Sequence, residues 1–263
     1  MSGLGIKLDF TSTRVLSGIE VAHIKQAQMT YLGYFGQNAG ETVKNRSKGD
    51  LVTPTVIYMP DNQVLGANYM TSSDRALSAG INSTGQPKQL PQTLFAVFNS
   101  GDVQATTGST YGSAIISAWG DNPATNSNPG RLSIGLFRTQ AGEPYIAMRW
   151  GTSANVPALA CAVPFEWMNA TGPILAIGSR DETGAMALEV RVDGAVLKAS
   201  AQVTPVAIPE TSSAWRVYVG QISTYPIDNL RLYAAAAWSA YLTPEELTAE
   251  LNVMEINLLG HLS

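Results

Sequence analysis

The sequence contains one cysteine and two histidines among 263 residues. A single thiol excludes an intrachain disulfide, and these counts leave too few ligands for a zinc site built from Cys and His. Cys161 stands in an apolar run, residues 157–163, so we expect a small buried hydrophobic residue rather than a nucleophile. His23 and His261 lie near opposite ends of the chain and no Gly-x-Ser-x-Gly motif occurs, which argues against a catalytic triad.

Charge is also scarce. Only 14% of the residues are charged, the formal net charge is −4, and the 16 lysines and arginines are scattered without a cluster. The chain therefore offers no electrostatic footprint for nucleic acid. No stretch approaches the roughly 20 apolar residues of a membrane-spanning helix, and the first residues contain no apolar run of signal-peptide length. We expect no membrane insertion, and synthesis in the cytoplasm without a signal peptide.

Short apolar and alternating runs dominate from about residue 51, separated by turn-forming residues. The composition, 45% hydrophobic with 24 glycines and 14 prolines, suits an all-β domain. The spacing predicts a jelly-roll β-sandwich rather than alternating strands and helices. Strands are predicted over residues 52–59, 92–98, 112–119, 131–138, 144–150, 173–179, 186–192, 195–199, 215–222 and 228–238.

Local signals define two hairpins and one helix. Asp193-Gly194 favours the positive-φ geometry of a two-residue hairpin turn, and residues 140–143 form a Gly-containing loop between two strands. Thr243 is the predicted helix N-cap, with Glu246 completing a capping box. The helix is expected at about 244–256, with an apolar face formed by Leu247, Leu251 and either Met254 or Val253.

The first fifty residues differ from the rest. Residues 19–32 show mixed apolar spacing, typical of a short helix or an irregular strand, and residues 44–50 are polar and charged. We therefore predict two parts, an N-terminal arm over 1–50 and a sandwich over 51–263. An arm is ordered only when something holds it, which would be its own sandwich or a neighbouring subunit.

The last third of the chain carries a family resemblance. Residues 172–178, the hairpin 187–197, Val219-Gly220 and the helix start 242–247 resemble the concanavalin A-like lectin and glucanase superfamily, above all its laminin G-like branch. The resemblance covers about residues 90–251 and does not reach the first fifty. The chain departs from it at 234–237, where four alanines stand in place of the frequent Asn-Arg-Ala. The resemblance implies a jelly-roll sandwich.

Members of this superfamily are frequent in bacterial secreted proteins and in phage or prophage tail proteins. With no signal peptide and no disulfide, this chain is more similar to the phage type. We therefore expect a non-enzymatic virion structural protein in a tail, baseplate or capsid-decorating position. The arm would contact other virion proteins, the chain would form a homo-oligomer, and the sandwich would face a cell-surface glycan.

Two alternatives on the same fold stay open, a glycoside hydrolase and a free-standing carbohydrate-binding module. Glucanases of this superfamily place three carboxylates at i, i+2 and i+4 on one strand. The corresponding alternation here, Glu189, Arg191 and Asp193, has a basic residue in the middle. The pattern favours a solvated strand face with cross-strand pairs. No catalytic residue is predicted.

Glycan binding would use exposed aromatic side chains beside planar polar groups, because sugars combine apolar C–H faces with hydroxyl groups. Most of the five tryptophans are expected in the core. The best exposed candidates flank the polar loop 121–130. The predicted glycan-binding residues are Tyr111, Trp119, Asp121, Asn122, Asn126 and Asn128. Oxygen groups of this loop, or of Asp61-Asn62, could also hold calcium. No other cofactor is expected.

Overall fold

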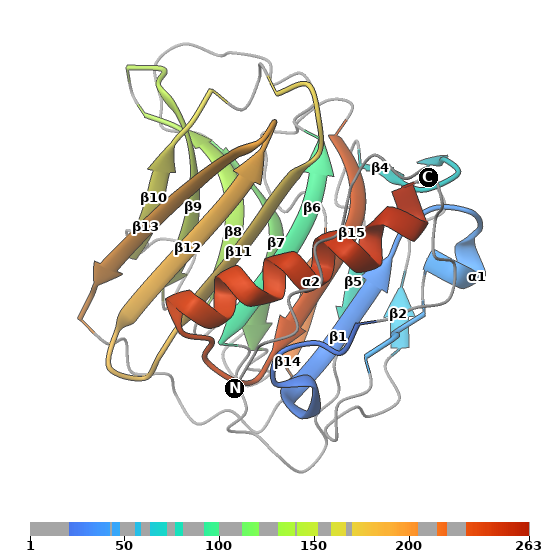
Figure 1. Cartoon of the computed structure of the whole chain (residues 1–263), viewed down its shortest axis with the longest axis horizontal. Helices are drawn as coiled ribbons and strands as arrows, with labels where there is room; N and C mark the ends of the chain where they lie inside the picture. The colour runs from blue at the N-terminus through green and yellow to red at the C-terminus, as the bar shows by residue number, and fades with distance from the viewer. Residues whose placement is uncertain are drawn as a thin grey trace, which may run out of the picture.

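The computed structural model describes residues 21–42, 44–47, 56–58, 64–72, 77–80, 92–99, 112–120, 131–139, 141–151, 159–166, 170–204, 215–219 and 230–262. Within these ranges the strands form two antiparallel sheets that face each other (Figure 1). One sheet contains, in spatial order, β13 (Ala195–Gln202), β12 (Ala185–Val192), β11 (Ile174–Arg180), β6 (Thr93–Asn99), β15 (Leu230–Trp238), β4 (Met70–Ser72) and β3 (Val64–Leu65), with β1 (Met29–Tyr34) also paired to β15. The other contains β10 (Leu159–Pro164), β9 (Pro144–Gly151), β8 (Arg131–Arg138), β7 (Gly112–Gly120), β14 (Trp215–Val219), β5 (Leu77–Gly80) and β2 (Val56–Tyr58).

The predicted all-β sandwich is confirmed, and its core follows from strand alternation. On β6, Leu94 and Phe98 face the space between the sheets, whereas Phe95 and Val97 face the opposite way. Both sets are fully buried, so the eight-stranded sheet has a hydrophobic core on each of its faces. The seven-stranded sheet contributes to the inner core through alternate residues of β8 and β9, such as Ile134.

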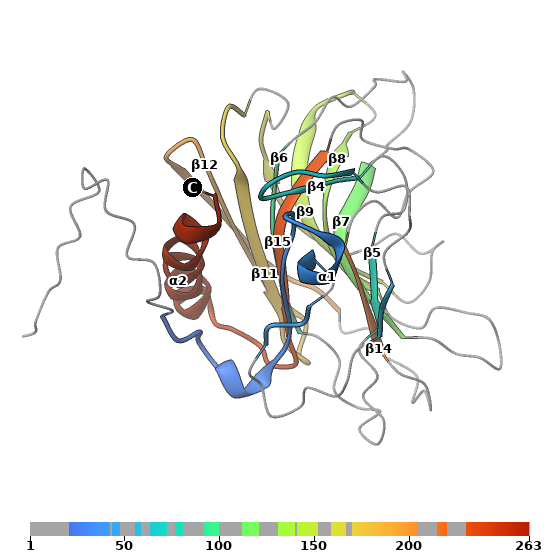
Figure 2. The same cartoon turned by 90° about the vertical axis from the view of Figure 1, so that its right-hand side faces the viewer.

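The second core lies under the C-terminal helix, α2 (Pro244–Leu262), which crosses the outer face of the eight-stranded sheet (Figure 2). Leu247, Leu251, Met254 and Leu258 recur every three or four residues, so they share one face and are buried. The capping box at Thr243 and Glu246 is confirmed, with Thr243 N donating to Glu246 Oε2 at 2.9 Å. The helix is six residues longer than we predicted.

Part of the predicted N-terminal arm belongs to the sandwich. The structure has a 3-10 turn, η1 (Gln26–Gln28), then β1, and then α1 (Ala39–Thr42). β1 pairs with β15 from Met29 to Tyr34. The division predicted at residue 50 therefore does not separate an arm from the sheet, because the apolar side chains of β1 fill both cores. An anchoring role stays a prediction for residues 1–20, which lie outside the described ranges.

Polar contacts fasten the segment before β1 to α2. Ile24 N donates to Glu250 Oε2 at 2.7 Å, and His23 Nδ1 lies 2.8 Å from Glu250 Oε1. Trp238 Nε1 donates to Ile24 O at 3.2 Å. Because Glu250 is fully buried, these contacts supply the partners that a buried carboxylate requires. The chain's own helix thus holds residues 21–28 in place.

Turn residues account for the two hairpins that the sequence predicted. Asp193 and Gly194 have φ values of 47° and 79°, the positive-φ pair of a tight two-residue turn between β12 and β13. The Asp193 carboxylate accepts hydrogen bonds from Thr171 N and Gly172 N at 3.0 and 2.9 Å, which lowers the pKa of Asp193. Gly142, at φ 88°, turns the loop between β8 and β9.

Gly184 and Gly142 provide a matched test of how this scaffold depends on glycine. Both have φ near 90°, so alanine strains either backbone by about 1–2 kcal/mol. At Gly142 a Cβ would meet nothing within 4 Å, whereas at Gly184 it would collide with the carbonyl oxygen of Val203. We expect Gly184→Ala to lower the free energy of unfolding by at least about 2 kcal/mol more than Gly142→Ala, measured by denaturant titration. Equal losses would contradict this reading of the turn.

Candidate functional site

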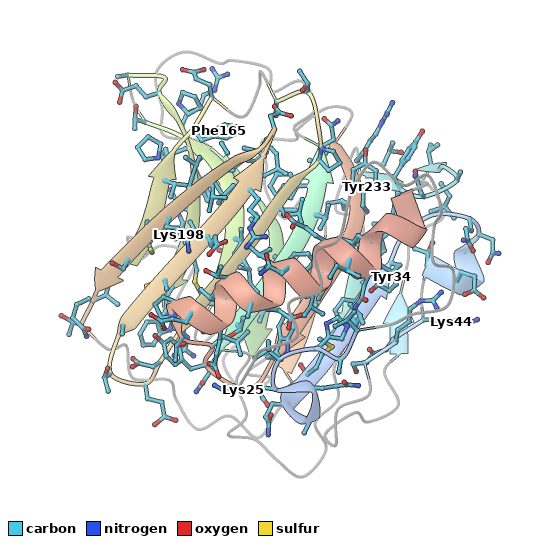
Figure 3. The ribbon with its side chains drawn as sticks, viewed as in Figure 1. Lys25, Tyr34, Lys44, Phe165, Lys198 and Tyr233 are labelled. Carbon is cyan, nitrogen blue, oxygen red and sulfur yellow. The ribbon has the colours of Figure 1, made fainter. Side chains whose placement is uncertain are left out.

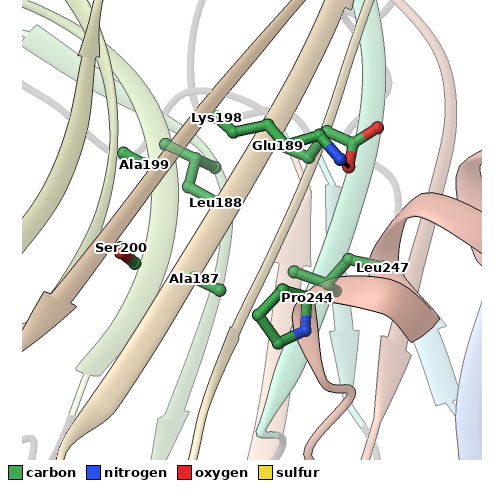
Figure 4. Close-up of a pocket in the computed structure, with 8 residues that line it drawn as sticks. All are labelled: Ala187, Leu188, Glu189, Lys198, Ala199, Ser200, Pro244 and Leu247. Atoms are coloured by element: carbon green, nitrogen blue, oxygen red, sulfur yellow. Dashed lines mark ion pairs between the residues drawn. The ribbon is translucent and has the colours of Figure 1, made fainter.

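A groove of about 270 Å³ lies between the start of α2 and the outer face of β12 and β13 (Figure 4). One wall is aliphatic, with Pro244 and Leu247 from the helix. The other carries Glu189 and Lys198, which are cross-strand partners. The lining residues are Ala187, Leu188, Glu189, Lys198, Ala199, Ser200, Pro244 and Leu247.

Glu189 is the buried centre of a polar network that fastens α2 to the sheet. Its side chain is 2% exposed. Oε1 accepts from Arg191 Nε at 3.0 Å, and Oε2 accepts from Thr248 Oγ1 at 2.6 Å and pairs with Lys198 Nζ at 3.0 Å. Arg191 reaches on to the helix and donates to Thr248 O and Asn252 Oδ1. The network therefore binds two strands to the first three turns of α2.

Two opposing effects act on the pKa of Glu189. Burial disfavours its charged form and raises the pKa, but hydrogen bonds from Thr248, Lys198 and Arg191 favour the carboxylate and outweigh burial. The pKa of Glu189 therefore lies below its usual value. At neutral pH this side chain is a fixed negative charge and hydrogen-bond acceptor, not a proton donor.

Lys198 is the reachable charge at the groove. Its side chain is 54% exposed, and it lies on the same face of the sheet as α2 (Figure 3). Nζ donates to Thr248 Oγ1 at 2.7 Å in addition to pairing with Glu189. An ammonium group has three N–H donors, so one remains for a ligand. Ser200 lies two residues further along β13 and adds an exposed hydroxyl.

The structure changes the interpretation of the Glu189, Arg191 and Asp193 pattern. The predicted cross-strand pairing is confirmed by the contact between Glu189 and Lys198. The prediction that this face is solvated is wrong at Glu189, because α2 covers it. Asp193 points to the turn at the sheet end and binds residues 171 and 172 instead.

Sequence reasoning missed Lys198, although a signal was present. A two-residue turn at 193–194 sets residue 192 opposite 195, and counting back along both strands sets 189 opposite 198. Alternation then puts both side chains on one face. The hairpin alone could therefore have identified the pair of Glu189 and Lys198. It could not have identified α2, which buries Glu189.

The predicted glycan-binding residues fall mostly outside the described ranges. These are Tyr111, Asp121, Asn122, Asn126 and Asn128. Trp119 lies on β7 of the seven-stranded sheet, where its backbone is in register with Arg131 on β8 and Arg216 on β14. Trp119 and the groove therefore belong to different sheets.

The calcium prediction rests on residues 61–62 and 121–128, which the structure does not describe. In the part of the chain that it does describe, no group of three or more His, Cys, Asp or Glu side chains is placed to hold a metal ion. Over the same residues, no helix combines the length and the apolarity needed to cross a membrane.

Comparison with known proteins identifies the fold. No protein-family model and no curated protein sequence matches the chain. Among solved structures, it is similar to Trypanosoma rangeli sialidase in complex with sialic acid, with a TM-score of 0.51 and 14% identity over 88% of this chain and 34% of the sialidase. It is also similar to the receptor binding domain of botulinum neurotoxin D, with a TM-score of 0.53 and 12% identity over 88% of this chain and 53% of that domain.

These likenesses establish a shared β-sandwich fold. At 12–14% identity they concern the fold alone. The chain spans about a third of the sialidase and about half of the toxin domain.

The Glu189 network predicts a specific loss of stability on substitution. Glu189→Gln removes the charge that Arg191 and Lys198 oppose, and we expect the free energy of unfolding to fall by about 1–3 kcal/mol at neutral pH. Glu255→Gln is the matched control, because Glu255 is 45% exposed and also pairs with Arg191. A loss of no more than about 1 kcal/mol is expected there. Equal losses in the two variants would contradict a central role for Glu189.

The same network predicts a pH dependence. The folded pKa of Glu189 is below its unfolded value, so the unfolded chain takes up this proton first as pH falls. Its stabilisation is fully present above the unfolded pKa of about 4.3 and is lost as pH falls through the folded pKa. The difference in unfolding free energy between wild type and Glu189→Gln should therefore shrink below that pH, measured by denaturant titration at several pH values. A difference that does not change with pH would refute the assignment.

Proposed function

We propose that this chain is a non-enzymatic, lectin-like domain that binds a carbohydrate in the groove between α2 and the strands β12 and β13. The observation that carries the proposal is the two-sided lining of the groove. Lys198 and Ser200 offer hydrogen-bonding groups, and Pro244 and Leu247 offer an aliphatic surface opposite. A sugar ring presents hydroxyl groups at its rim and C–H groups on its faces, which suits such a lining.

Preorganisation supports this assignment. Glu189 holds Lys198 through an ion pair, and Thr248 holds it from the helix side. A lysine fixed in this way loses less side-chain freedom when a ligand binds than a solvated lysine does. The fold shared with a sialidase in complex with sialic acid supports the same class of ligand.

A second surface is favoured by a separate observation. Trp119 stands in register between Arg131 and Arg216 on the seven-stranded sheet. The register thus brings one aromatic and two arginine positions together on neighbouring strands, a combination of residue types suited to binding a sugar. This surface competes with the groove as the glycan site, and the two are separable by mutation.

The absence of catalysis is part of the proposal. Glycoside hydrolysis uses two carboxyl groups about 5–10 Å apart, and the acid of the pair needs a raised pKa. Glu189 is the one carboxylate among the eight residues that line the groove, and its pKa is lowered. Both facts favour binding over hydrolysis.

We further propose that the domain serves in a phage particle, with residues 1–20 as the contact to neighbouring virion proteins. This rests on the resemblance of the sequence to phage-type lectin-like domains. His23 and Ile24 are bound to the chain's own helix, so the proposed contact is assigned to the residues that precede them.

Glycan binding is tested with arrayed neutral and acidic oligosaccharides, followed by calorimetry on the best ligand. We expect Lys198→Ala to weaken binding roughly tenfold, the cost of one hydrogen bond to a charged group. Lys44→Ala is the control, because Lys44 is also an exposed lysine paired with a glutamate, Glu41. Loss of binding in Trp119→Ala with Lys198→Ala unchanged would move the site to the seven-stranded sheet. Wild type that binds no glycan would refute the function.

The anchoring proposal is tested by two truncations. Deleting residues 1–20 should leave the thermal midpoint unchanged and reduce self-association in light scattering. Deleting residues 1–45 should unfold the chain, because it removes β1 from the sheet. Full self-association after the shorter deletion, or a chain that is monomeric at full length, would contradict the proposed anchor.

A further inference from the structure

Arg180, the last residue of β11, is a buried cation with no ion-pair partner among the described residues. It is 3% exposed. Its Nε has no hydrogen-bond partner, and its side chain makes no hydrogen bond or ion pair with any residue that the structure describes. Buried charges in proteins are normally paired, because removing an ion from water is costly unless another group compensates it. Within the described residues, Arg180 therefore lacks the hydrogen-bond acceptor that a buried guanidinium normally has.

The position of Arg180 follows from strand alternation. The preceding residue, Ser179, faces α2 and accepts a hydrogen bond from Leu242 N. Arg180 therefore points the opposite way, into the space between the two sheets. There its guanidinium carbon lies 4.1 Å from the ring centre of Trp150, on β9 of the other sheet.

Trp150 provides a second unpaired donor at the same place. Its indole Nε1 is buried and also lacks a hydrogen-bond partner among the described residues. Stacking on an aromatic face leaves the N–H groups at the edge of a guanidinium available. Arg180 and Trp150 thus place two N–H donors without a hydrogen-bond partner, Nε of Arg180 and Nε1 of Trp150, beside one cation, with no acceptor for them among the described residues.

The nearby acidic side chains do not neutralise this cation. The Asp181 carboxylate is used within its own turn, where it accepts from Ala185 N and from Thr183. Glu182 is exposed. Burial lowers the pKa of Arg180 to about 10, with the charges of Glu182 and Asp181 acting in the opposite direction. Arg180 stays protonated at neutral pH.

We propose that Arg180 and Trp150 form a binding site for one oxyanion group, a carboxylate or a sulfate, carried by an acidic ligand. A guanidinium edge matches the two oxygens of such a group, and the indole N–H adds a further donor. The site lies between the sheets and the groove lies on the outer face of one sheet, so this inference does not depend on the proposed glycan function.

Calorimetric titration of the full chain tests the site with four probes at constant ionic strength. Glucuronate carries the carboxylate on a sugar, its methyl ester and glucose remove the charge, and sulfate supplies a free oxyanion. We expect glucuronate to bind at least about tenfold more tightly than its ester or glucose, as a charge-assisted pair requires. If sulfate binds as tightly as glucuronate, the oxyanion alone is the ligand. Weaker sulfate binding would identify an acidic sugar.

Variants assign the binding to these two residues. Arg180→Met keeps an apolar contact with the Trp150 ring and should reduce oxyanion affinity at least about tenfold. Trp150→Phe keeps an aromatic face but removes the N–H, and should reduce the affinity several-fold. If Arg180→Met does not fold, Trp150→Phe alone tests whether the oxyanion binds at this site. Lys44→Ala, which changes an exposed lysine outside both proposed sites, should leave oxyanion affinity unchanged. Wild type that binds neither glucuronate nor sulfate, or variants that bind them like wild type, would overturn the proposal.

Discussion

The central strands of the eight-stranded sheet are buried on both faces, and most of the structure depends on this. β15 has β6 on one edge and β4 and β1 on the other, so its backbone groups are paired within the sheet. Its residues 234–237 are four alanines that alternate between the inner core and the core under α2. A sheet buried in this way needs apolar residues at successive positions, and the runs in β6 and β15 supply them.

The helix is the element that forms the groove on this sheet. Its apolar face covers part of the sheet, and its polar contacts with Glu189 and Arg191 fix where that cover stops. The groove lies where the part of the sheet that α2 covers meets the part that it leaves uncovered. Because the same side chains anchor the helix and shape the groove, the packing of the helix and the form of the groove depend on the same contacts.

Local features of the fold were predictable from the sequence. The hairpin of β8 and β9, the turn at 193–194 and the capping box at Thr243 each depend on residues within a few positions of one another. β1 and β10 were not predicted, because their pairing depends on strands distant in sequence or on an apolar run without clear alternation.

The candidate sites were predictable only in part, because they also depend on contacts between elements that are distant in sequence. Alternation places Arg180 on the face opposite Ser179, but its stacking on Trp150 depends on how the second sheet packs. Likewise, the burial of Glu189 depends on a helix that begins 55 residues later in the chain. Hairpin register relates strands that are neighbours in sequence, whereas both candidate sites lie where elements distant in sequence meet.

Cys161 confirms its predicted role as a buried hydrophobic residue, at 1% exposure on β10. Burial raises the pKa of its thiol to about 11, with a backbone hydrogen bond to Leu188 acting the other way. The thiolate is the reactive form, so burial and the raised pKa both slow alkylation of the folded chain at neutral pH. With one cysteine per chain, the rate of alkylation reports the openings that expose Cys161 on β10, whether local or global. The protein thus contains its own reporter of these openings, with no engineered label.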